Sequence, residues 1–179
     1  MELVERTNEL LILAETFKEA AQGRGATVVV SGEPGIGKTA LVREFTESLG
    51  NRVRVLWGVC DDLTSPRPLG PFRDIARHGE MPATADRDEL LEALADVLSF
   101  KQRPAVLVIE DVHWIDDASV DIIRYLVRRL ATLPAMLIMT RRSEEMAPEH
   151  PLRRAMAGLT HSELRRIELP ASPTNRCGP

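Results

Sequence analysis

With 179 residues, 44% of them hydrophobic and 28% charged, the chain has the size and composition of one soluble globular domain. Its formal net charge of −4 gives no electrostatic argument for nucleic-acid binding, and no apolar run approaches the roughly 20 residues that a membrane-spanning helix needs. The start, "MELVERTNEL", is too acidic and polar for a secretory signal, and the two distant cysteines, Cys60 and Cys177, indicate reduced thiols, so we expect a cytoplasmic protein.

The first predicted element is a helix over residues 7–21, capped by Thr7 or Asn8. Its apolar stripe is expected to consist of Leu10, Ala14, Phe17 and Ala21. Five short apolar runs then predict strands, at residues 26–32, 52–60, 105–111, 135–141 and 164–169. Helices are predicted between them, at residues 38–49, 71–78, 86–99, 116–134 and 150–158.

This alternation of strands and helices predicts an α/β fold, a three-layer sandwich with a mostly parallel five-stranded sheet. Such sheets bind ligands at the carboxyl ends of their strands, and each candidate motif of this chain falls at such an end. We expect one domain over residues 1–169. The Pro-rich polar stretch 170–179 has no periodic pattern and is expected to be disordered.

Residues 31–42, "SGEPGIGKTALV", contain two glycine patterns at once. "GEPGIGKT" fits the phosphate-binding P-loop (Walker A) pattern, and "GIGKTA" fits the turn that binds dinucleotides. The dinucleotide interpretation leaves the Lys-Thr pair unused, and no acidic residue stands about 20 positions after Gly35. A glycine turn without a ligand is disfavoured, because the pattern lies between a predicted strand and a predicted helix. We therefore favour the P-loop.

In a P-loop, backbone N–H groups and the start of the following helix surround the phosphates. The residues expected to do so are Gly32, Glu33, Pro34, Gly35, Ile36, Gly37, Lys38, Thr39 and Ala40. Lys38 is expected to reach the β- and γ-phosphates and to be exposed when the loop is empty, and the Thr39 hydroxyl to bind Mg²⁺.

Two acids, Glu110 and Asp111, end the apolar run "VLVIED", as in a Walker B strand. They would lie beside the P-loop if this strand neighbours the first one. One of them can hold Mg²⁺, and the other can orient or deprotonate an attacking water. His113 and Trp114 follow the acids, and the lone histidine is interpreted as a packing or capping residue. Arg141 and Arg142 end the fourth strand, where an arginine can contact a γ-phosphate or form a solvated pair with Glu144 and Glu145.

The stretches "GEPGIGKTALVREF" and "VLVIEDVHWIDDAS" together resemble the ATP-binding module of large bacterial LuxR-type regulators. These are the MalT-like members of the STAND signalling ATPases, which are related to AAA+ proteins. The resemblance covers residues 3–169 and includes the opening "LVERTNELL", where the family has a Gly-Arg-Glu stretch and this chain lacks the glycine. "HWID" is its most distinctive part.

The resemblance implies roles for particular residues. Its phosphate loop falls on residues 32–39, its magnesium acid on Glu110 and its second acid on Asp111; its sensor arginine falls on Arg141 or Arg142. The family usually has Asp-Asp where this chain has Glu-Asp. Family members also continue into a helical lid, repeats and a DNA-binding domain, so the sequence is expected to be a truncated or fragmentary form, without direct DNA binding of its own.

The leading hypothesis is an ATP-binding module of a signalling ATPase that binds Mg-ATP and hydrolyses it slowly, with further domains or other chains as partners. A second hypothesis is a small-molecule kinase, for which the loop "DDLTSPRPLGPFRD" is the only candidate acceptor site. A third is a module that binds nucleotide without turnover, or an inert remnant.

Overall fold

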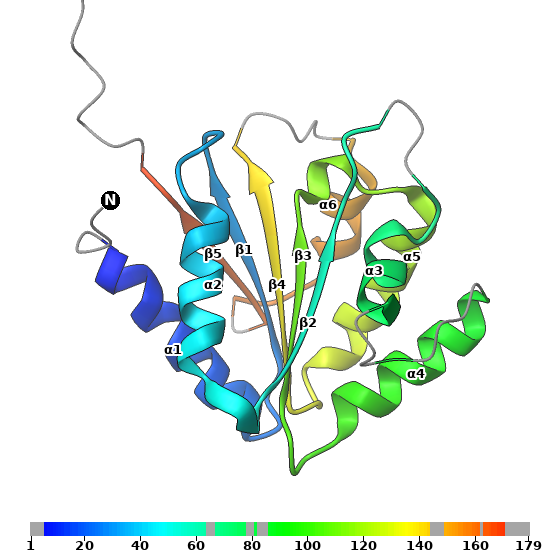
Figure 1. The fold of residues 1–179 in the computed structure, drawn as a ribbon, viewed down its shortest axis with the longest axis horizontal. Helices are drawn as coiled ribbons and strands as arrows, with labels where there is room; N and C mark the ends of the chain where they lie inside the picture. The colour runs from blue at the N-terminus through cyan, green and yellow to red at the C-terminus, as the bar shows by residue number, and fades with distance from the viewer. Residues whose placement is uncertain are drawn as a thin grey trace, which may run out of the picture.

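A computed structural model describes residues 6–63, 67–77, 81, 86–143, 149–161 and 163–170. Five strands form its single sheet (Figure 1). They are β1 (Ala26–Gly32), β2 (Arg54–Val59), β3 (Ala105–Glu110), β4 (Ala135–Arg142) and β5 (Leu164–Glu168). The strand order is β2-β3-β4-β1-β5, and every pairing is parallel. The predicted fold class is confirmed, with a wholly parallel sheet where the sequence indicated a mostly parallel one.

Helices cover both faces of the sheet, which makes the predicted three layers (Figure 1). One face packs against α1 (Thr7–Ala21) and α2 (Lys38–Ser48). The other carries α3 (Gly70–Arg77), α4 (Arg87–Ser99), α5 (Asp117–Leu130) and α6 (Pro151–Met156). Two 3-10 turns, Gly50–Arg52 and Val112–Trp114, follow α2 and β3.

Burial of β1 and β3 explains why both strands read as continuous apolar runs. All seven residues of β1 and all six of β3 are buried. Successive side chains of a strand point to opposite faces, so Val28 and Val30 pack under α1 and α2 whereas Val29 joins the core under the other helices. The two hydrophobic clusters hold the sheet rigidly between its helices and fix the positions of the strand ends.

The first helix differs from its prediction. Its fully buried residues are Leu13, Thr16 and Ala20, whereas Ala14 is exposed. Arg6 occupies the cap position, and neither Thr7 nor Asn8 caps the helix. A helix of mixed apolar residues offers several stripes of similar hydrophobicity, and contact with β4 and α2, which is long-range information, selects among them. Asp116 caps α5, and its carboxylate accepts a hydrogen bond from the Ser119 N–H.

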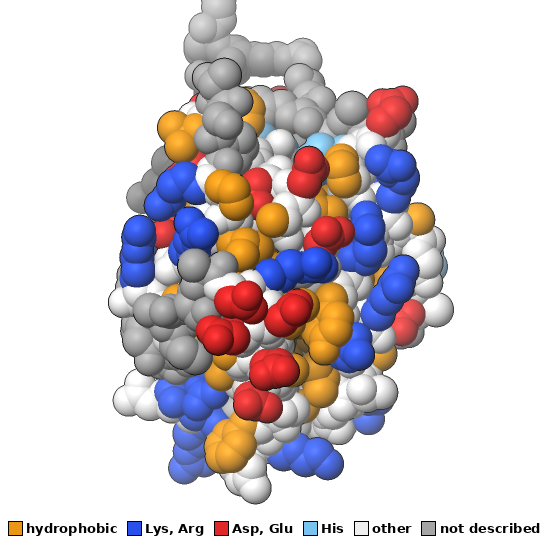
Figure 2. Space-filling view, turned by 90° about the vertical axis from the view of Figure 1, so that its right-hand side faces the viewer, with side chains coloured by type: hydrophobic (Ala, Val, Ile, Leu, Met, Phe, Trp, Pro, Cys, Tyr) orange, Lys and Arg blue, Asp and Glu red, His pale blue; other side chains and the backbone are white. Residues whose placement is uncertain are grey.

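None of the helices that the structure describes is long and apolar enough to cross a membrane. Figure 2 shows the face at the right-hand side of Figure 1, where Asp and Glu side chains gather near the centre with Lys and Arg around them. This face therefore mixes both signs of charge and presents no continuous basic surface.

Candidate functional site

The P-loop connects β1 to α2 at the carboxyl edge of the sheet, in the context that the sequence predicts. Gly35 and Gly37 have φ angles of 74° and 93°, a left-handed backbone that side chains with a Cβ rarely adopt. Gly37 is also the residue from which α2 begins. The glycines thus bend the loop so that it ends at a helix N-terminus, where N–H groups without intrahelical partners favour an anion.

Arg6 braces the P-loop from outside. Its guanidinium donates to the carbonyl oxygen of Gly37 at 2.8 Å and to that of Ile36. A Cβ on Gly37 would lie only 3.0 Å from the Arg6 side chain. Sequence reasoning missed this residue. The resemblance drew attention to the stretch "VERTNE", but a contact across 31 residues leaves no local signal in the sequence.

Lys38 is buried in the structure, which corrects the expectation of an exposed lysine. Its ammonium group donates to the carbonyl oxygens of Gly32 at 3.0 Å and Glu33 at 2.9 Å. The lysine therefore lies folded along the loop that it was predicted to serve. The reason is local: these carbonyls lie five and six residues before Lys38, within reach of its four-carbon stem, and an ammonium removed from water needs acceptors.

Glu110 joins the P-loop to the end of β3. The Thr39 hydroxyl donates to one carboxylate oxygen of Glu110, and the Trp57 indole N–H donates to the other at 3.0 Å. The condition stated above, that this strand neighbours the first, is wrong, because β4 lies between β1 and β3. Glu110 nevertheless reaches Thr39, since the longer glutamate side chain and the start of α2 close the gap across β4.

Asp111 takes a different position from Glu110. Glu110 is buried, whereas Asp111 is half-buried and lines an open cavity of about 490 Å³ above the P-loop. The backbone of Asp111 is left-handed, with φ of 54°, and its N–H donates to the Thr140 hydroxyl on β4 at 3.1 Å. This turn directs two adjacent carboxylates to different places, one against Thr39 and one into the cavity.

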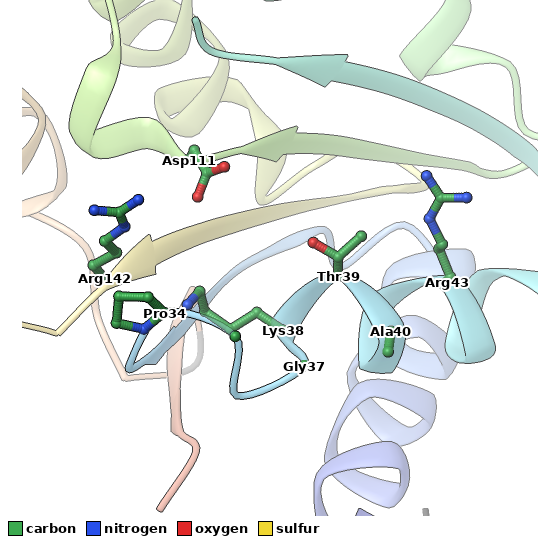
Figure 3. Close-up of a pocket in the computed structure, with 9 residues that line it drawn as sticks. Pro34, Gly37, Lys38, Thr39, Ala40, Arg43, Asp111 and Arg142 are labelled. Atoms are coloured by element: carbon green, nitrogen blue, oxygen red, sulfur yellow. The ribbon is translucent and has the colours of Figure 1, made fainter. Parts of the chain in front are cut away.

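The two arginines at the end of β4 also lie in different places, each beside a different cavity. Arg142 lines the cavity above the P-loop. Figure 3 shows Arg142 and Asp111 at the ends of their strands, across the cavity from the residues of the loop. Arg141 lines a different cavity. Among the described residues, this cavity is lined by Pro34, Gly35, Gly37, Lys38, Thr39, Ala40, Arg43, Asp111 and Arg142. Of the predicted site residues, Gly32, Glu33, Ile36, Glu110 and Arg141 are not among these.

Trp57 is a second residue that sequence reasoning missed. It was assigned only to a strand, yet its indole N–H holds the Glu110 carboxylate, and the Arg43 guanidinium lies 5.4 Å from its ring centre. Since a tryptophan in a strand is most simply a packing residue, nothing in the sequence marked it. The pair of hydrogen bonds from Thr39 and Trp57 leaves the Glu110 side chain little freedom to turn.

We expect Trp57→Phe to weaken the response to magnesium. Phenylalanine keeps a ring for packing but lacks the N–H, so the Glu110 carboxylate loses one of its two restraints. The Mg²⁺ concentration that half-saturates nucleotide binding should rise about fivefold, in line with loss of about 1 kcal/mol from one hydrogen bond. Calorimetric titration with and without Mg²⁺ measures this.

Trp114→Phe is the matched control, because Trp114 packs beside His113 and against the core under α5. Equal effects of the two substitutions on the magnesium response would contradict the role of the Trp57 N–H.

Magnesium fits the oxygen donors at this place. Among the described residues, no group of three or more acidic, histidine or cysteine side chains is placed so that it could hold a metal ion. Mg²⁺ does not need one, because it is commonly bound by one or two protein oxygens together with water and substrate phosphates. The Thr39 hydroxyl and the Glu110 carboxylate are in contact beside the P-loop, which is such a donor pair.

The other residues considered above lie away from the cavity lining. His113 is buried beside Trp114, as a packing interpretation predicts. In the proposed acceptor loop, Arg67 is held by Asp61 at 2.7 Å and does not line the cavity above the P-loop; residues 64–66 lie outside the described residues. Cys60 is a free, buried cysteine whose thiol pKa is raised by burial and by nearby carboxylates, first that of Asp116.

A parallel five-stranded sheet of order β2-β3-β4-β1-β5, with a P-loop after β1 and two adjacent acids at the end of β3, defines the class of P-loop NTPases. A family model described as AAA ATPase domain matches residues 2–139, most of the chain. The chain therefore belongs to the AAA ATPase domain family.

Solved structures of the same fold include the Cdc6p protein of Pyrobaculum aerophilum, with a TM-score of 0.63 and 20% identity over 93% of this chain and 46% of that one. Drosophila ORC bound to DNA matches with a TM-score of 0.62 and 17% identity, over 92% of this chain and 42% of the other. The Orc1 protein of Aeropyrum pernix in complex with DNA matches with a TM-score of 0.54 and 18% identity, over 92% of this chain and 45% of the other. Identities this low establish the fold alone.

An uncharacterised protein of Rhizobium meliloti (strain 1021) is 26% identical over 91% of this chain and 21% of its own length. The chain thus spans about a fifth of this relative and less than half of each of the three structures named.

Proposed function

We propose that the chain is a nucleotide-binding module that binds Mg-ATP and hydrolyses it slowly. One observation carries the proposal: the Thr39 hydroxyl of the P-loop contacts the Glu110 carboxylate at the end of β3, beside a cavity that Asp111 and Arg142 also line. A glycine turn that only connects a strand to a helix does not require a hydrogen bond between its threonine and a carboxylate 71 positions further along the chain. Membership of the AAA ATPase domain family supports the same assignment.

The P-loop and Lys38 would bind the phosphates. The N–H groups at the start of α2 attract negative charge, and the ammonium of Lys38 would exchange its bonds to loop carbonyls for the β- and γ-phosphate oxygens. This exchange satisfies the buried ammonium in both states. The loop carbonyls that it leaves lie beside the open cavity, where water can replace it.

Thr39 and Glu110 would hold Mg²⁺, which when bound neutralises charge on the β- and γ-phosphates. Asp111 would then act on the water. As the water oxygen bonds to the γ-phosphorus, the bond from that phosphorus to the bridging oxygen breaks, and ADP leaves with its electron pair. The carboxylate of Asp111 would orient the water and accept its proton, since it faces the cavity whereas both oxygens of Glu110 are engaged.

We expect Arg142→Ala to weaken ATP binding about tenfold and to leave ADP binding unchanged, because only ATP carries the γ-phosphate that the guanidinium would contact and a charged hydrogen bond contributes about 1.5–3 kcal/mol. Arg141→Ala is the matched control, since Arg141 precedes it on β4 but lines the other cavity. Competition titrations with the two nucleotides measure both. A larger effect of Arg141→Ala would reverse the assignment of the sensor.

The regulatory role is proposed from the resemblance to the LuxR-type, MalT-like modules. In such a protein, ATP and ADP states differ through contacts with other parts of the molecule. The chain alone carries the nucleotide cavity in an open form, so we propose slow turnover, with other domains or chains as partners and no direct binding of DNA by these residues.

A turnover assay tests this function. Purified chain with Mg-ATP should release phosphate to water at a low rate, well below about 1 s⁻¹ per chain, the low end for typical enzymes. The Asp111→Asn chain is the control for contaminating ATPases. Tight binding with no phosphate release above that control would leave a binding-only module, and transfer of the phosphoryl group to an added acceptor would favour a kinase.

A further inference from the structure

A second cavity, of about 350 Å³, lies on the sheet face opposite α1 and α2. Its lining consists of Val29, Arg141, Ser143, Arg153, Met156, Ala157 and Arg166. Val29 and Met156 belong to the hydrophobic core of that face, so the floor is apolar. Three of the seven described lining residues are arginines and none is acidic. Nothing in the proposed nucleotide site uses this cavity.

The three arginines come from three separate elements. Arg141 is the last residue but one of β4, Arg153 lies on α6, and Arg166 lies on β5. A pair of arginines on one exposed helix face is ordinary surface chemistry, but here the fold brings together cations that are distant in sequence around one hollow. Arg166 and Arg165 are neighbours on β5, yet Arg165 points to the other face and binds Glu19 of α1 at 2.7 Å.

Electrostatics within this cavity favour a negative ligand. Burial lowers the pKa of Arg141, the nearby Glu168 carboxylate raises it, and the charges of Arg153 and Arg166 lower it. The Glu168 carboxylate accepts a hydrogen bond from the Ser143 hydroxyl at the rim. Three like charges around one hollow repel one another, and a bound anion would relieve that repulsion.

We infer that this cavity binds an oxyanion group, a phosphate or a carboxylate, independently of the nucleotide. A guanidinium presents two parallel N–H donors that match the oxygens of either group, which makes arginine the preferred residue for such ligands. Because Arg141 and Arg142 are adjacent on β4, the same strand end borders both cavities.

The experiment titrates inorganic phosphate, and separately glutarate as a carboxylate probe, into the folded chain at constant ionic strength. All variants carry Lys38→Ala, which weakens phosphate binding at the P-loop. Arg166→Gln is then compared with Arg165→Gln, its neighbour on the opposite face of the same strand. Arg153→Gln, on exposed α6 surface, is the second test variant. Circular dichroism and thermal midpoints confirm that each variant is folded.

We expect Arg166→Gln and Arg153→Gln each to raise the dissociation constant for phosphate, for glutarate or for both about tenfold, whereas Arg165→Gln leaves it unchanged. Tighter binding of one probe identifies the group that the cavity prefers. The inference is wrong if neither probe binds to the Lys38→Ala chain, or if the Arg165 and Arg166 variants bind equally. Because every sample carries Lys38→Ala, phosphate binding at the P-loop is weakened equally in all of them, and a difference between the Arg165 and Arg166 variants reports on the second cavity.

Discussion

Lys38→Ala should raise the dissociation constant for Mg-ATP at least about a hundredfold, because it removes two or more charged hydrogen bonds to phosphate, each of about 1.5–3 kcal/mol. Isothermal titration of the variant and the original chain measures the change. The substitution should also lower the free energy of unfolding by about 1 kcal/mol, because the buried ammonium holds the carbonyls of Gly32 and Glu33 in the empty loop.

Lys101→Ala is the matched control, since Lys101 is exposed in the turn between α4 and β3. It should change neither quantity. A Lys38→Ala chain that is folded and binds Mg-ATP with unchanged affinity would rule out the P-loop as the phosphate site.

Asp111→Asn should leave Mg-ATP binding within about twofold of the original chain and lower the hydrolysis rate about 10²- to 10⁴-fold, the usual contribution of a positioned acid or base. Asparagine has nearly the same size and accepts the left-handed backbone found at this position, so the turn after β3 should survive. Single-turnover measurement of phosphate release separates the effect on chemistry from the effect on binding.

Glu110→Gln is the matched comparison, because it makes the same chemical change one residue earlier, where the carboxylate contacts Thr39. We expect this variant to require more Mg²⁺ and to lose affinity for Mg-ATP more than for ATP alone. If Asp111→Asn alters the magnesium requirement and Glu110→Gln does not, the two roles are exchanged.

Local patterns sufficed to predict the strands, because β1 and β3 are buried on both faces and leave apolar runs that no surface element imitates. The P-loop could be predicted in the same way, since its glycines and Lys38 stand in one short stretch with a fixed backbone. The two acids were proposed as site residues because Glu110 ends a buried strand and Asp111 follows it directly. In each case the information lies within about ten residues.

Contacts between residues far apart in the sequence could not be predicted in this way. Neither the bond from Trp57 to Glu110 nor that from Arg6 to the P-loop leaves a pattern, because each joins residues more than 30 positions apart. The burial of Lys38 could not be inferred from its residue type. The choice between Arg141 and Arg142 as the residue beside the P-loop depends on which face of β4 each side chain takes, and only the strand order provides that.

The most direct test of the proposed site is a crystal structure of the chain with Mg²⁺ and a non-hydrolysable ATP analogue. We predict phosphate density along the loop from Pro34 to Thr39, with the lysine ammonium turned from the loop carbonyls to the β- and γ-phosphates. The metal should contact the Thr39 hydroxyl beside Glu110, and Asp111 and Arg142 should face the γ-phosphate. A nucleotide bound elsewhere on the chain, or an empty loop at saturating analogue concentration, would contradict the account.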